Sequence, residues 1–453
     1  MNTSIGIDGA GTVRRPIDSK STVIAFAVAI LAWATDYKSQ GAGSAAAFQG
    51  VLLLTYFGML VRVTLTAIRA ELEFGTVWVL LFAVGIFMAD SAILAFSVHR
   101  DPYAIFVNLI PPFVFASASA LTYFTLSIAS DRLSLILNVL RVACLVYAAG
   151  HLGIVFMTKG IDVAHSRFEV FSGAVTPSLA IMAIMLIRRV SRIELVIVIF
   201  NLAIALLSVT RTLFAVLIAQ VASIFLVHPS SLTKGKTLKG VGLVTVVCVA
   251  LAAVDFATGA GLVARWVDRL TVGARLGADP TALTRSAETY FMMHNFTMST
   301  ESLLFGNGLA AHIYMTGPDA ARAARLVGWQ SVSLFDIGYG HQNYANILFI
   351  AGLLGGGGLL IMQILNGLQA LLVIRKVQLL DDSKENPEAH LGIWGALIVV
   401  GTLTYGLLGA VIGDRSTCVW YGIGTGILYW YRQRSNASVA APAAISGIPV
   451  SSG

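Results

Sequence analysis

The chain has 453 residues, of which 57% are hydrophobic and only 12% are charged, and its mean hydropathy is +0.81. Soluble globular domains carry charge on about a quarter of their residues, so this composition excludes a soluble globule and indicates an integral membrane protein. The formal net charge of +7 does not require a nucleic-acid partner, because most of the cations fall where they would meet anionic lipid. We therefore expect membrane lipid, and no nucleic acid, among the partners.

Apolar runs recur along the chain at lengths that approach a membrane-spanning helix, which needs roughly 17 to 25 residues. They cover residues 22–36, 44–61, 76–98, 103–128, 132–157, 170–187, 193–209, 211–227, 239–258, 346–373, 391–412 and 417–431. The sequence therefore predicts an all-α polytopic membrane protein with about 12 transmembrane helices and one large, partly helical periplasmic loop.

The distribution of cations predicts the orientation, because Lys and Arg in short loops mark the cytoplasmic side. With the N-terminus inside, seventeen of the 30 Lys and Arg residues fall in cytoplasmic segments and five in short outer loops. Both termini are then cytoplasmic. The predicted division is a cytoplasmic segment over 1–20, transmembrane helices 1–9 over 21–258, a periplasmic catalytic loop over 259–345, transmembrane helices 10–12 over 346–431 and a disordered cytoplasmic tail over 432–453.

Arg211 follows the seventh apolar run and opens the eighth, which predicts a cation in a tight hairpin at the outer membrane boundary. A lipid-linked phosphate would lie at this depth, although an Arg that only snorkels to the interface is the alternative. Asp90 and Arg141 fall within predicted spans at comparable depth, where isolated charges are costly. We expect these two residues to form an ion pair.

The long loop over 259–345 carries six cations, and all of them are arginines: Arg265, Arg269, Arg275, Arg285, Arg322 and Arg325. Planar guanidinium groups suit bidentate recognition of phosphate oxygens. Arg265 and Arg269 are four residues apart, which places both on one face of a short helix. This helix either lies along the interface with Trp266 at headgroup level or is solvated, with its arginines paired to Asp268.

The loop also contains three histidines, and histidine is the side chain whose ordinary pKa suits general-base catalysis near neutral pH. His341 is favoured over His294 and His312, because it stands beside Gln342 and Asn343 where the loop re-enters the membrane. Asp336, Tyr339 and Glu288 are candidate orienting partners or sugar ligands, and the sequence does not choose among them.

Metal and nucleotide signatures are missing from the sequence. HExxH does not occur, carboxylates do not recur at a metal-binding spacing, and the glycines over 355–358 lack the GK[ST] of a phosphate loop. The three cysteines, Cys144, Cys248 and Cys418, are widely separated and are expected to pack within spans. We expect neither a metal nor a cofactor.

Three short motifs occur in order around the loop. They are Ser208-Val209-Thr210-Arg211, then Leu303-Leu304-Phe305-Gly306-Asn307-Gly308-Leu309, then His341-Gln342-Asn343-Tyr344 with Gly352 completing an H-x10-G spacing. Over residues 200–360 the chain thereby resembles the O-antigen ligase and Wzy-type polysaccharide polymerase superfamily of bacterial envelope enzymes. A ligase-like R-x3-L pattern also occurs, from Arg322 to Leu326.

The resemblance implies a metal-independent glycosyltransferase of the bacterial inner membrane that uses a polyprenyl-diphosphate-linked oligosaccharide at the periplasmic face. We expect a polysaccharide polymerase. The second candidate is an O-antigen ligase that transfers glycan to lipid A core. The alternative from another class of protein is a multi-span transporter or lipid-linked oligosaccharide flippase. A chain-length regulator and a flippase of the same pathway are further expected partners. The expected catalytic residues are His341 and Arg211, and the expected diphosphate or sugar ligands are Arg265, Arg269, Arg285, Glu288, Tyr339, Gln342 and Asn343.

Overall fold

The computed structural model describes residues 18–35, 44–159, 172–188, 190–227, 234–259, 261–327, 340–378 and 386–445. Within these ranges the secondary structure is helical, as predicted. The first half of the chain forms α1 (Ser19–Ala32), α2 (Ser44–Arg69), α3 (Gly75–Ser97), α4 (Pro102–Ile128), α5 (Leu133–Lys159), α6 (Val175–Ile184), α7 (Arg192–Leu207), α8 (Thr212–Val227) and α9 (Lys234–Thr258). The second half forms α10 (Leu262–Leu276), α11 (Pro280–Thr297), α12 (Thr300–Phe305), α13 (Pro318–Val327), α14 (Asn343–Ala351), α15 (Gly357–Gln378), α16 (Pro387–Gly406) and α17 (Arg415–Ile445).

The number of spans differs from the prediction. Among the described residues, six helices are long and apolar enough to cross a membrane, or seven if the bent pair of α9 and α10 is one span. These helices indicate a multi-pass membrane protein, but the prediction of about twelve spans is wrong. The apolar runs do form helices, yet α7 and α8 have 16 residues each. At ~1.5 Å per residue such a helix rises about 24 Å, less than the ~30 Å of a hydrocarbon core.

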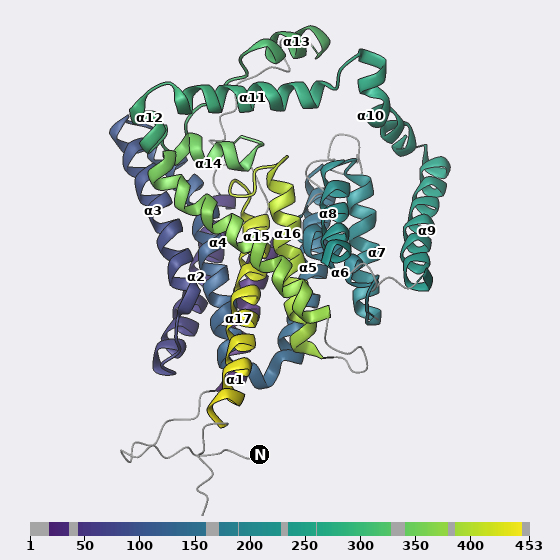
Figure 1. Cartoon of the computed structure of the whole chain (residues 1–453). Helices are drawn as coiled ribbons and strands as arrows, with labels where there is room; N and C mark the ends of the chain where they lie inside the picture. Colours follow the sequence, from purple (N-terminus) through teal and green to yellow (C-terminus); the bar gives the residue numbers. More distant parts are fainter. Residues whose placement is uncertain are drawn as a thin grey trace, which may run out of the picture.

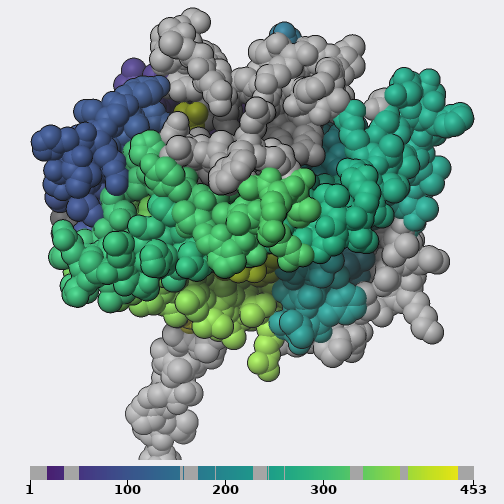
Figure 2. Space-filling view, turned by 90° about the horizontal axis from the view of Figure 1, so that it is seen from above, coloured from purple at the N-terminus to yellow at the C-terminus, as the bar shows by residue number. Residues whose placement is uncertain are grey.

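The helices form an upright bundle whose two ends are built differently (Figure 1). At one end Arg62 donates to Ser21 at the start of α1, and Arg434 of α17 pairs with Glu388 of α16 at 3.0 Å. At the opposite end α11 lies across the bundle, with α13 above it. Seen from above, α10, α11 and α12 form a band across this surface (Figure 2). The described parts of the predicted loop, residues 261–327 and 340–345, therefore lie over one end of the bundle.

The core of the bundle is built on close packing of α17 against α4. A Cβ atom added at Gly422 would lie 2.6 Å from the carbonyl oxygen of Phe115, and one added at Gly426 would lie 2.5 Å from that of Ser119. Small residues let helix backbones approach in this way. Tyr421 stacks on Phe115 with 4.4 Å between ring centroids. This packing fixes the start of α17 and the segment that joins it to α16.

The end of α17 lies within residues 432–453, the segment predicted as a cytoplasmic tail, and the helix ends at Ile445. Alanine has the highest helix propensity, and this stretch is rich in it. Its alanines are Ala437, Ala440, Ala441, Ala443 and Ala444. Residues 446–453 lie outside the described part of the chain.

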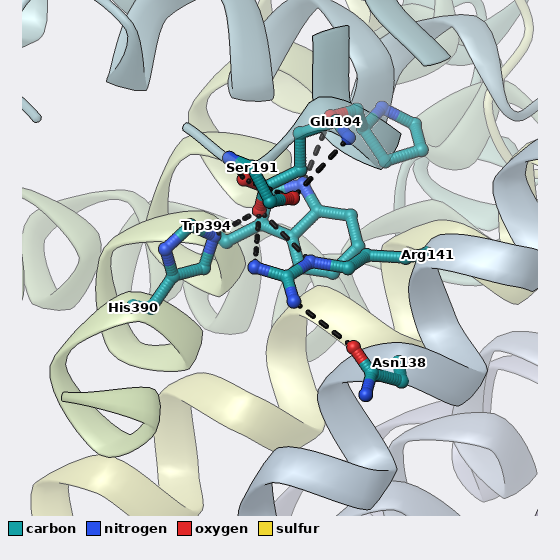
Figure 3. Close-up of polar contacts among 7 residues, drawn as sticks. Asn138, Arg141, Ser191, Glu194, His390 and Trp394 are labelled. Atoms are coloured by element: carbon teal, nitrogen blue, oxygen red, sulfur yellow. Dashed lines mark hydrogen bonds and ion pairs between the residues drawn. The ribbon is translucent and has the colours of Figure 1, made fainter. Parts of the chain in front are cut away.

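Arg141 lies in a buried polar cluster that joins α5, α7 and α16 (Figure 3). Its Nη2 and Nε donate to Glu194 Oε1 at 2.8 and 3.0 Å, and its Nη1 donates to Asn138 at 3.0 Å. His390 Nε2 lies 2.8 Å from the same oxygen of Glu194. Glu194 also accepts from the backbone N–H of Ser191 at 2.7 Å, so one carboxylate caps α7 and contacts the Arg141 guanidinium and the His390 imidazole of the neighbouring helices.

The predicted ion pair between Asp90 and Arg141 is therefore wrong. Asp90 lies on α3, which packs against α4 and α15, whereas α5 packs against α7. A Cβ atom added at Gly355 would lie 2.5 Å from Asp90 Oδ2, so this carboxylate faces the glycine-rich turn before α15. Estimated depth in the membrane did not distinguish helices that are neighbours from helices that are not.

Candidate functional site

The candidate site is formed around α11, whose start is fixed by local capping. Asp279 accepts from the backbone N–H of Thr281 at 3.0 Å, and Pro280 occupies the first turn, where its missing N–H has no cost. The buried face of α11 packs toward the bundle. It consists of Leu283, Ala287, Glu288, Met292 and Phe296. The burial of Glu288 on an otherwise apolar face calls for a hydrogen-bonding partner.

That partner is His341. Its Nδ1 lies 2.9 Å from Glu288 Oε2 and 3.0 Å from Oε1, and its backbone N–H donates to Oε2 at 3.2 Å. The Glu288 side chain is 2% exposed, whereas that of His341 is 38% exposed. A carboxylate that accepts from Nδ1 favours the imidazole tautomer with its lone pair on Nε2, and it stabilises the imidazolium that forms when Nε2 takes a proton.

The turn that presents His341 is held by three side-chain amides. Gln342 caps α14 by accepting from the backbone N–H of Ala345, and Asn346 accepts from the N–H of Gly340 at 3.2 Å. Asn343 is buried and accepts from the N–H of Ile412 at 3.1 Å, which ties the turn to the segment after α16. The structure thus gives Asn343 a positioning contact. Tyr339, also predicted as a ligand, lies outside the described residues.

The glycines of the second and third motifs lie where two backbones cross. A Cβ atom added at Gly306 would lie 2.5 Å from the backbone of Ile350, and one added at Gly352 would lie 2.3 Å from the carbonyl oxygen of Leu304. Arg100 donates to the carbonyl oxygens of Gly308 and Leu309 at 2.9 and 2.7 Å. These contacts hold α12 and the segment after it against α14 and the end of α3.

Arg285 lies one helical turn before Glu288 on α11. Its Nη1 is buried and has no hydrogen-bond partner among the described residues. Burial lowers the pKa of the Arg285 guanidinium from its usual range, while Glu288 and Asp279 oppose this shift and Arg211 adds to it. Guanidinium groups remain charged at neutral pH, and a desolvated charge with an unused donor is costly. Arg285 is therefore suited to receive an anionic oxygen.

Arg211 lies near the Arg285 guanidinium, in the hairpin between α7 and α8. It forms an ion pair with Asp279, and its Nη1 donates to the carbonyl oxygen of Arg269 at 3.3 Å. Partial burial opposes ionisation of Asp279, but hydrogen bonds from Arg211 and the Thr281 amide outweigh it and lower the pKa of the carboxyl group. The position of Arg211 therefore fixes the junction of α10 and α11 to the bundle.

Arg265 and Arg269 lie on α10, which is helical as predicted. Trp266 does not stand at a free interface: its Nε1 donates to the carbonyl oxygen of Leu206 at 2.8 Å, and its ring packs on Phe214. Leu270, predicted on the same flank, is 66% exposed. Asp268 pairs with Arg275 at 2.6 Å.

A pocket of about 520 Å³ opens beside His341. Its wall is formed by Arg285, Ser286, Thr289, Tyr290, Met293, His341, Gln342, Leu407 and Leu408. Of the predicted site residues, Arg285, His341 and Gln342 lie on this wall and Glu288 lies directly behind it. Arg211, Arg265, Arg269 and Asn343 are not on the wall.

The remaining lining residues were missed by the sequence argument. Ser286, Thr289, Tyr290 and Met293 repeat at helical spacing from Arg285, so a helical projection of α11 would have found them. Leu407 and Leu408 belong to the segment between α16 and α17, and no local pattern distinguishes them.

Among the described residues, no three His, Cys, Asp or Glu side chains gather in a group that would hold a metal ion. No family model matches the chain, and no curated protein sequence matches it.

Proposed function

We propose that the chain is a membrane glycosyltransferase that transfers an oligosaccharide from a polyprenyl diphosphate carrier to an acceptor hydroxyl. The observation that carries the proposal is the shared pocket wall of Arg285 and His341, a cation with an unused buried donor beside a histidine held by a buried carboxylate. Pockets of roughly 300 to 1,000 Å³ are typical of small-molecule sites. The expected location is the periplasmic face of the bacterial inner membrane, with both termini in the cytoplasm.

The chemistry requires a base and an anion-binding group on opposite sides of one sugar carbon. The acceptor oxygen attacks the anomeric carbon of the donor sugar, its proton passes to His341 Nε2, and the bond from that carbon to the diphosphate oxygen breaks. The bonding electron pair stays on the diphosphate, where Arg285 would stabilise the growing charge. Glu288 would stabilise the imidazolium. The products are the extended glycan and the free polyprenyl diphosphate.

Arg211 takes a different role in this proposal from the one first expected. Its ion pair with Asp279 and its bond to the Arg269 carbonyl support a role in positioning the start of α11, which lies six residues before Arg285. Arg285 replaces it as the proposed phosphate ligand.

We favour a polymerase that extends a polysaccharide by whole repeat units, on the strength of the sequence motifs. The test is to delete the gene in its host, restore it as wild type, His341→Gln or Arg285→Ala, and measure surface glycan length together with carrier-linked intermediates. Single repeats accumulating on the carrier support a polymerase. Long carrier-linked glycan supports an O-antigen ligase, and intermediates confined to the cytoplasmic face support a flippase.

Arg275→Ala is the matched control, because Arg275 lies in the same loop but is exposed and paired with Asp268. Membrane levels of each variant are measured in parallel. Normal glycan length with both His341→Gln and Arg285→Ala, at normal protein levels, overturns the proposal.

A further inference from the structure

We propose that an aromatic surface beside the pocket, formed by Tyr290, His294, His312 and Tyr314, binds the sugar rings of a glycan whose end enters the pocket. This inference rests on the proposed function and specifies where the carbohydrate lies. It assigns a binding role to His294 and His312, which the proposed reaction does not use.

The exposed face of α11 leads directly away from the pocket. Its exposed residues Ala282, Ser286, Tyr290 and His294 recur every four positions, which places them in one row along the helix. Ser286 and Tyr290 also line the pocket. A ligand that leaves the pocket along this row would therefore pass over Tyr290 and reach His294.

Tyr290 is held as a fixed platform. The imidazole of His294 is parallel to its ring, with 5.9 Å between centroids and 4° between planes. Gly317, at φ +87°, lies so close that an added Cβ atom would be 2.7 Å from Tyr290 Cδ1. Tyr290 is nonetheless 49% exposed. A ring already fixed by its neighbours loses little conformational entropy when a ligand stacks on it.

Tyr314 and His312 lie on the segment between α12 and α13 and contact α11 through Phe291. Burial alternates along the segment that carries it, because Ala311 and Ile313 are buried whereas His312 and Tyr314 are exposed. The Tyr314 ring lies 5.3 Å from that of Phe291 on α11 and 6.4 Å from that of His312. Two exposed rings are thus connected to α11, one through its own helix and one through Phe291.

The polar groups around these rings match a carbohydrate. Ser286 Oγ donates to Asp319 Oδ2 at 2.5 Å beside Tyr290, and Thr289 adds a second hydroxyl on the pocket wall. Sugar rings present C–H groups on their faces and hydroxyl groups at their edges. Aromatic faces are electron-rich and attract C–H groups, while carboxylates, hydroxyls and imidazoles exchange hydrogen bonds with sugar hydroxyls.

A membrane interface is the competing occupant, since tyrosine also gathers at headgroup level. α10 and α11 differ in the kind of side chain that they expose. α10 exposes the aliphatic residues Val263, Val267 and Leu270, whereas Tyr290 is the only large apolar side chain that α11, described over its whole length, leaves exposed. The observations favour sugar.

The test measures binding of neutral oligosaccharides of about three to six sugars, cut from the host's surface polysaccharide, to the detergent-solubilised full chain. Loss of one stacking contact worth about 1.4 kcal/mol corresponds to a roughly tenfold weaker affinity. We expect about that loss in Tyr290→Ala and in Tyr314→Ala, near-wild-type binding in Tyr290→Phe, and saturation transfer from tyrosine ring protons to the sugar in the wild type.

Tyr103→Ala is the matched control, because Tyr103 is 68% exposed at the start of α4 and takes no part in the surface. His341→Gln separates the two proposals: it is expected to lower the transfer rate roughly 10²- to 10⁴-fold and to weaken oligosaccharide binding less than Tyr290→Ala does. If Tyr290→Ala does not fold, Tyr314→Ala and His294→Ala carry the test. The aromatic-surface proposal is overturned if the folded ring variants keep the wild-type affinity, if Tyr103→Ala loses as much affinity, or if the variants change only binding to anionic vesicles. The transferase proposal is tested separately, by the transfer rate of His341→Gln.

Discussion

Glu288 receives two hydrogen bonds from His341, one from the backbone N–H at 3.2 Å and one from Nδ1 at 2.9 Å. The two residues are 53 positions apart, and the carboxylate is almost fully buried whereas the imidazole reaches the pocket. A buried carboxylate so placed fixes both the orientation of the ring and the position of the chain that carries it.

The first prediction follows from this pair. His341→Gln is expected to lower the transfer rate by roughly 10²- to 10⁴-fold, the usual contribution of a positioned general base. Glu288→Gln keeps the shape but removes the charge, so we expect a smaller fall in rate with little change in KM. The measurement is the rate of glycan extension in isolated membranes. A loss confined to KM in both variants would show that the pair only binds substrate.

The pair of His341 and Glu288 also shows how much of the candidate site could be predicted from the sequence. Residue type and loop position were enough to nominate His341, Glu288 and Arg285, because these groups are unusual in so apolar a chain. The contact between Glu288 and His341 depends on the path of α11 across the bundle, which periodicity does not encode; Asp336 and Tyr339, the other candidate partners, lie outside the described residues.

The number of membrane spans and the pairing of some charged residues did not follow from the sequence, for related reasons. The apolar runs predicted helices, but hydropathy did not separate a 16-residue helix such as α7 from a helix long enough to span. The ion pair between Arg211 and Asp279 was not expected either, and the predicted contact of Arg211 with phosphate stays a prediction. Charge pairing between distant segments depends on packing that a single sequence does not reveal.

The second prediction concerns pyrophosphate binding by Arg285. A hydrogen bond to a charged group contributes about 1.5 to 3 kcal/mol, so Arg285→Ala should weaken inhibition by inorganic pyrophosphate roughly 10- to 100-fold. Arg285→Lys should restore part of it, because the point charge remains but the fork is lost. Inhibition constants for the wild type, both variants and Arg275→Ala provide the measurement. Equal losses at Arg275 would show that general loop charge, and not Arg285, attracts the anion.

The third prediction concerns acid. The pKa of Asp279 is lowered in the folded chain, so ionised Asp279 adds stability above the unfolded pKa of about 3.9, and this contribution is lost as pH falls through the lower folded pKa. We expect the melting temperature of the wild type to fall below about pH 4 more steeply than that of Asp279→Asn. Melting of the detergent-solubilised protein between pH 3 and pH 7 checks this. Parallel curves for the two proteins would contradict a role for Asp279 in acid sensitivity.

The fourth prediction separates stability from chemistry through the buried cluster of Arg141, Glu194 and His390. The Arg141 and Glu194 side chains are 8% and 1% exposed, and removing one partner of such a pair leaves an uncompensated buried charge, at a cost of about 3 to 5 kcal/mol. Arg141→Ala should therefore lower the melting temperature and the amount of protein in the membrane.

Arg141→Met combined with Glu194→Gln is expected to recover part of that loss, because both charges are gone and glutamine still completes the cap at Ser191. The protein that does fold should transfer glycan at a near-normal rate per molecule, since the cluster joins α5, α7 and α16 and contributes no residue to the pocket wall. Arg275→Ala, which breaks an exposed pair, should leave the melting temperature almost unchanged. A double variant as unstable as Arg141→Ala would show that the hydrogen-bonded geometry, and not the unpaired charge, stabilises this part of the bundle.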